Sequence, residues 1–158
     1  MFVNIDSDSF PLVKVVFGKT PKSYEDLDIF FETWLQLYQN KQEFTFLLDT
    51  RNCGNIPIKY SYYISKQISK IKKLKTQYLQ RTIVIMQSNW IKNLMKILFK
   101  IVKPVAPVYI VKKQDTSEQL YFRLKNNLLK SDLDYDLIDS KKPAKASNNS
   151  PCCDTHSQ

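Results

Sequence analysis

Lysine side chains dominate the middle of the chain, and their number and spacing suit the binding of anions. Residues 59–113 contain 13 bases and no acid, within a chain of 158 residues that has a net charge of +9. Two triplets have helical spacing, which places the lysines of each triplet on one helix face. They are Lys66, Lys70 and Lys73, and Lys92, Lys96 and Lys100. This charge favours a polyanionic partner, such as an anionic lipid surface, an acidic protein or, less readily, nucleic acid. The alternative is a lysine surface that only keeps the protein in solution.

A second candidate site follows a short apolar run at residues 44–48. Asp49, Thr50 and Arg51 come directly after this run, and open α/β sheets bind ligands at the carboxyl ends of their strands. Arg51 and Asn55 are therefore candidates for binding an anion. The alternative is that Asp49 caps the local backbone and that Arg51 is solvated.

The residues needed for most catalytic chemistries are missing from the interior of the sequence. The single histidine is His156, two residues from the end, and the two glycines, Gly18 and Gly54, cannot form a dinucleotide or Walker-type phosphate loop. We therefore expect no catalytic residues, no metal site and no cofactor, and a protein that is not an enzyme.

The three cysteines fit neither a disulfide framework nor a metal site, and we expect them to be reduced. Cys53 is expected to be a half-buried loop residue. Cys152 and Cys153 are adjacent in a polar segment and are candidates for lipidation by palmitoylation, the alternative being unmodified thiols. The chain begins without a signal-peptide pattern, and lysines interrupt its richest apolar stretch. We expect no transmembrane segment and a cytoplasmic location. If the basic block, residues 59–113, binds lipid, the protein would be peripheral to a membrane.

The hydrophobic pattern predicts the scaffold that positions these residues. Strands are expected at 1–6 and 10–17 as a hairpin, then at 44–48, 82–86 and 108–111. Helices are expected to begin after the caps Ser23, Ser88 and Asp115, and a further helix is expected to begin at Pro57. The order ββαβαβαβα indicates an α/β fold with a single mixed, mainly parallel sheet whose N-terminal β-hairpin forms an antiparallel edge. Residues 1–130 are expected to form one domain. Residues 131–158 contain an acidic run and a polar stretch, which predicts a disordered tail.

This element order, with the strand at 44–48 ending in Asp49-Thr50-Arg51, resembles the STAS domain over residues 1–130. STAS is the fold of bacterial anti-sigma-factor antagonists and is often grouped with the CRAL-TRIO (Sec14-like) lipid-binding domains. The resemblance implies that the loop entering the second helix is the functional surface. Antagonists carry a phosphorylated serine there, whereas residues 54–57 of this chain contain none. The lipid-binding relatives imply a lipid role, although this chain lacks the extra helices of a full Sec14-type pocket.

These observations predict a non-catalytic STAS-like binding or regulatory module whose basic helix surface meets an anionic partner, most readily anionic membrane lipid. One alternative is a protein–protein interaction scaffold that acts through the loop at 49–57. A second is a nucleic-acid-binding accessory protein, for which Tyr62 is the tyrosine near the lysines expected to be free for base stacking. The oligomeric state is not predicted.

Overall fold

A six-stranded mixed sheet forms the centre of the computed structural model, which describes residues 1–111, 122 and 135–138. The strands lie in the order in which they occur in the chain. They are β1 (Val3–Asp6), β2 (Leu12–Phe17), β3 (Phe44–Asp49), β4 (Leu79–Ile85), β5 (Val108–Val111) and β6 (Tyr135–Ile138). Strands β2 to β5 are parallel, β1 is antiparallel to β2, and β6 is antiparallel to β5. The predicted α/β class, the mainly parallel sheet and the N-terminal hairpin are confirmed.

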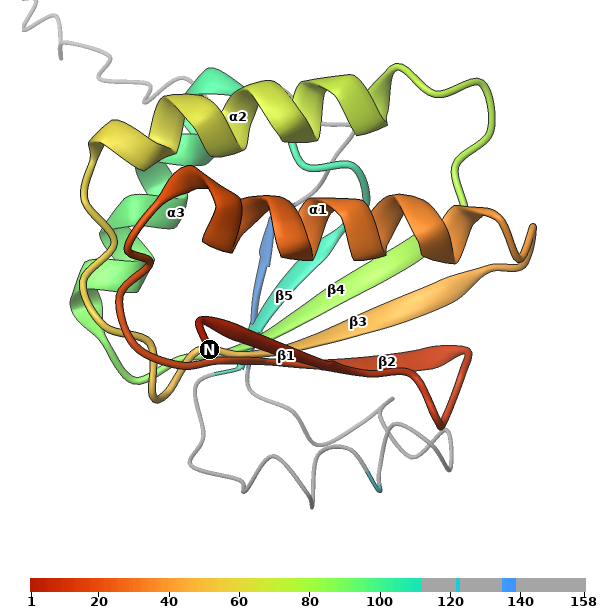
Figure 1. Ribbon diagram of the computed structural model, residues 1–158, viewed down its shortest axis with the longest axis horizontal. Helices are drawn as coiled ribbons and strands as arrows, with labels where there is room; N and C mark the ends of the chain where they lie inside the picture. Colours follow the sequence, from red (N-terminus) through yellow and green to blue (C-terminus); the bar gives the residue numbers. More distant parts are fainter. Residues whose placement is uncertain (112–121, 123–134, 139–158) are drawn as a thin grey trace, which may run out of the picture.

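Three helices cover one face of this sheet (Figure 1). They are α1 (Tyr24–Tyr38), α2 (Lys59–Lys72) and α3 (Asn89–Ile101). Each helix connects two neighbouring parallel strands, and such connections are right-handed. Because every connection steps to the next strand in the same direction, one handedness places all three helices on the same face. None of these helices is both long and apolar enough to cross a membrane.

Both faces of the sheet are apolar, as expected for parallel strands. The main core lies between the helices and the sheet, where Phe46 of β3 packs against Phe30 and Trp34 of α1. The other face carries a separate buried cluster, formed by Leu12, Leu47, Ile83, Ile85 and Val111. Since side chains alternate along a strand, Phe46 and Leu47 serve the two faces from adjacent positions.

Local sequence signals explain where the helices begin. Ser88 is the N-cap of α3, as predicted, and its hydroxyl accepts a hydrogen bond from the Trp90 amide at 3.2 Å. Ser23 occupies the N-cap position of α1 without a side-chain capping bond, and Glu25 and Asp26 place negative charge in its first turn. Helix α2 begins at Lys59, two residues beyond the predicted Pro57.

The prediction of a disordered tail from residue 131 is wrong for Tyr135–Ile138, which form β6. These residues pair with β5, where Val108 lies opposite Ile138 and Val111 lies opposite Tyr135. Strand β5 would otherwise present an unpaired edge, and β6 supplies its hydrogen-bond partners. The acidic residues around β6 suggested a solvated segment because local composition does not report a partner strand. The predicted helix after Asp115, the rest of the predicted tail and the cysteines Cys152 and Cys153 lie outside the described residues.

Candidate functional site

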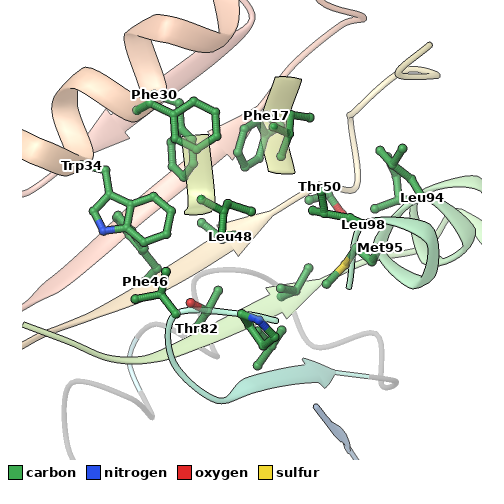
Figure 2. Close-up of a pocket in the computed structure, with 18 of the residues that line it drawn as sticks. Phe17, Phe30, Trp34, Phe46, Leu48, Thr50, Thr82, Leu94, Met95 and Leu98 are labelled. Atoms are coloured by element: carbon green, nitrogen blue, oxygen red, sulfur yellow. The ribbon is translucent and has the colours of Figure 1, made fainter. Parts of the chain in front are cut away.

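An apolar pocket of about 170 Å³ lies between the helices and the helix-covered face of the sheet. Phe30 and Trp34 of α1 stand on one side of it and Leu94 and Leu98 of α3 on the other, with Leu48 of β3 between them (Figure 2). The pocket is therefore bounded by elements that are far apart in the sequence.

The two sides of the pocket differ in stiffness because their side chains differ. On the α1 side, the rings of Phe30, Trp34 and Phe46 pack against one another with centroids 5.3 to 5.7 Å apart. Such ring pairs fix one another's orientation. The α3 side contributes leucines and Met95, whose unbranched thioether adapts readily to neighbouring groups. We infer that a ligand would displace α3 side chains more easily than the aromatic wall.

The start of α3 is tied to the loop that follows β3. The Trp90 indole N–H donates to the carbonyl of Ile56 at 3.3 Å. Gly54 of the same loop approaches the 18–20 segment closely, because a Cβ placed there would lie 2.9 Å from the Thr20 nitrogen. This loop contributes Thr50, Cys53 and Ile56 to the pocket wall.

None of the described residues that line the pocket is charged, and the few polar groups among them offer little chemistry. Thr50 uses its hydroxyl to donate to the Ile85 carbonyl at 2.9 Å, and Thr82 stands on the wall beneath Phe46 (Figure 2). Cys53 is half-buried, as predicted, and burial raises the pKa of its thiol to about 11. The site is therefore suited to holding an apolar group.

The raised pKa predicts that Cys53 reacts slowly with alkylating reagents. A thiol of pKa about 11 has about a hundredfold less thiolate near pH 8 than one at the ordinary value of 9.0. In a Cys152→Ser/Cys153→Ser variant, iodoacetamide should modify Cys53 about a hundred times more slowly in the native protein than in urea. Equal rates in the two conditions would show that the thiol is accessible and ordinary.

An empty pocket of this size lowers stability. Unfilled apolar space lacks the packing contacts that a filled interior makes. An engineered apolar cavity of similar size stays dry and binds benzene. The pocket is thus large enough to bind an apolar group, and filling it would stabilise the fold.

The residues predicted at the end of β3 form a closed ion pair. Arg51 donates from Nη2 to Asp49 Oδ2 at 2.7 Å and from Nε to Oδ1 at 3.0 Å, and its backbone amide also donates to Oδ1. The Asp49 side chain is 6% exposed and that of Arg51 is 23% exposed. Asn55 is exposed farther along the loop. The structure therefore directs the Arg51 guanidinium to an internal carboxylate, and anion binding by Arg51 and Asn55 stays a prediction.

The six predicted lysines, which lie on α2, at its C-cap residue Lys73 and on α3, reach solvent. Lys66, Lys70, Lys73, Lys96 and Lys100 are exposed, and Lys92 is half-exposed. Within the described part of the chain, the single ion pair joins Asp49 and Arg51, so no described carboxylate neutralises these lysines.

A second hollow, of about 220 Å³, lies beside α3 and was not anticipated from the sequence. It is lined by the apolar residues Met95, Ile110 and Ile138 and by Lys92 and Lys96. Met95 also lines the interior pocket, so the two hollows share one side chain. The sequence signal was present in α3, where the lysine row borders the apolar arc. The sequence did not predict the recess, because one of its lining residues, Ile138, belongs to β6, which pairs with β5.

Comparison with known proteins gives no match to a family model, to a curated protein or to a solved structure. The resemblance to STAS domains therefore stays a prediction that rests on the order of the elements and on the Asp49-Thr50-Arg51 junction.

Proposed function

We propose that the protein is a non-catalytic, STAS-like binding module that docks on anionic membrane surfaces through the lysines of α2 and α3. The supporting observation is that these six lysines reach solvent in a stretch of chain without a single acid. Near an anionic bilayer each lysine contributes about 1 kcal/mol. Six such contributions amount to roughly a 10⁴-fold preference for the charged surface, which gives reversible and salt-sensitive binding.

Co-sedimentation with vesicles tests this proposal. We expect the full chain to bind phosphatidylcholine vesicles that contain phosphatidylserine at low salt, to bind weakly at high salt, and to ignore pure phosphatidylcholine. Reversing the charge of all six lysines to glutamate on the two helices should abolish binding, and reversing one triplet alone should weaken it at least tenfold.

A matched control separates a local surface from net charge. Lys19, Lys22 and Lys41 are exposed and lie outside the basic block. Their reversal to glutamate changes the net charge as much as reversal of one helix triplet, yet it should leave most of the binding intact. Equal losses for the control and the helix triplets would contradict a defined docking surface, and so would a wild-type protein that fails to sediment at low salt.

Two other partners are separated in the same experiment. Added duplex or single-stranded nucleic acid should compete poorly, although Tyr62, at 72% exposure one turn before Lys66, provides a ring for stacking. The second candidate is a protein-binding role for the loop at 49–57, which leads to Ile58, a residue with 58% exposure. Substituting Ile58→Ser should leave vesicle binding unchanged and weaken only the binding of a protein partner.

A further inference from the structure

Met95 lines both the interior pocket and the recess beside α3. Leu94 and Leu98 face the pocket, whereas Lys92 and Lys96 follow on the adjoining part of the helix surface. Within about one helical turn, the surface of α3 therefore changes from apolar side chains to lysine side chains. A site that is apolar inside and cationic at its edge matches a molecule with the same two parts.

We propose that the pocket and the recess together bind one linear amphiphile with a single acyl chain and an anionic head, such as a fatty carboxylate. The acyl chain occupies the interior pocket and the carboxylate lies between the ammonium groups of Lys92 and Lys96. This goes beyond membrane docking, because the ligand is a monomer held inside the fold and requires no bilayer.

The form of the space favours a single chain over a bulky ring system. Each hollow alone is about as large as an engineered cavity that admits benzene, and the two are neighbours because they share a lining residue. Met95 is the side chain that lines both of them, and a methionine has the rotatable bonds to move aside. The aromatic wall of Phe30, Trp34 and Phe46 is packed ring against ring, which leaves the α3 side as the adaptable one.

Charge decides the nature of the head group. In the described part of the chain no charged residue lines the pocket, and Thr50 already donates its hydroxyl to the Ile85 carbonyl. The strong polar groups of the combined site are thus the two lysines, and no described carboxylate pairs with them. A neutral head would gain little there, whereas a carboxylate or phosphate head gains two charge-assisted contacts.

Thermal stabilisation by monomeric laurate, below its micelle concentration, is the primary measurement, with displacement of a fluorescent fatty-acid probe as the second. Laurate should raise the Tm of the full chain and displace the probe, and dodecanol, with the same chain and a neutral head, should bind about a hundredfold more weakly. Octanoate and palmitate then report the length of chain that the site accepts.

Variants assign the two halves of the site. Lys92→Gln/Lys96→Gln should weaken laurate binding about a hundredfold and leave dodecanol unchanged, whereas the control Lys66→Gln/Lys70→Gln should affect neither ligand. Ala106 lines the pocket and is buried, so Ala106→Leu should fill space and abolish binding of both ligands. Leu98→Phe fills the pocket from α3 and serves if the first variant does not fold.

Three results would overturn the proposal: no Tm shift and no probe displacement by laurate in the wild-type chain, laurate binding that survives both filled variants, or equal binding of laurate and dodecanol. The vesicle assay keeps the two proposals apart. A filled variant that loses laurate but still sediments with anionic vesicles supports the pocket site. A wild-type chain that sediments with vesicles but ignores laurate refutes the pocket site and leaves membrane docking intact.

Discussion

Replacing Phe46 with alanine is expected to lower the free energy of unfolding by about 3–5 kcal/mol, near the upper end of that range. Phe46 is 1% exposed and packs its ring against Phe30, Trp34 and Phe44. The cost of such a truncation depends on how far the surroundings collapse into the space left behind. Here the fold already maintains a pocket beside Phe46 without collapsing, so the new void should persist. Urea denaturation followed by tryptophan fluorescence measures the loss.

Two comparison variants make this expectation specific. Phe46→Leu keeps most of the buried volume and should cost clearly less than the alanine variant. Tyr62→Ala removes an aromatic ring of similar size from the solvent-exposed side of α2 and should change stability by less than about 0.5 kcal/mol. If Phe46→Ala loses under about 1 kcal/mol, the aromatic wall is not a fixed part of the core.

Removing the Arg51 side chain is expected to destabilise the fold by roughly 3 kcal/mol, more than removing that of Asp49. The reason is the difference in burial within the pair, since the Asp49 carboxylate is 6% exposed and the Arg51 side chain 23%. Arg51→Ala leaves a buried carboxylate without its guanidinium, whereas Asp49→Ala leaves a guanidinium that already reaches water. Chemical denaturation of the two single variants compares these costs directly.

The double variant tests whether the two residues act as a pair. Asp49→Ala/Arg51→Ala should cost less than the two single variants added together, with a coupling of about 1–3 kcal/mol. Strict additivity would show that the ion pair contributes little. If Arg51→Ala proves harmless to stability but abolishes binding of an anion, Arg51 serves the ligand role predicted from its place after β3.

Much of the scaffold was predictable because it is encoded locally. Ser88 precedes the apolar periodicity of α3 and caps it, and the apolar run at 44–48 forms β3, a strand buried on both faces. The lysine triplets were correctly expected to reach solvent, because their spacing places them opposite the apolar stripe of each helix.

The features that could not be predicted depend on residues distant in the chain. A filled core and a pocket use the same apolar side chains, so Leu94 and Leu98 predict burial but not the space before them. The hydrogen bonds from the Arg51 guanidinium to the Asp49 carboxylate depend on the conformation of the backbone turn between them. A spacing of two residues in the sequence does not determine that conformation. Strand β6 owes its position to the free edge of β5, and the acidic residues around it gave no local sign of that pairing.

The strictly sequential order of the strands has a consequence for synthesis on the ribosome. Every strand from β2 to β6 pairs with the strand that precedes it in the chain, so its partner has already been translated when it emerges. Connections of one helix or less also keep the closing loops short through β5, which favours rapid docking. The sheet can therefore grow from its N-terminal hairpin in the direction of translation. Until residue 138 has left the exit tunnel, its growing edge is β5, and β6 completes the sheet last.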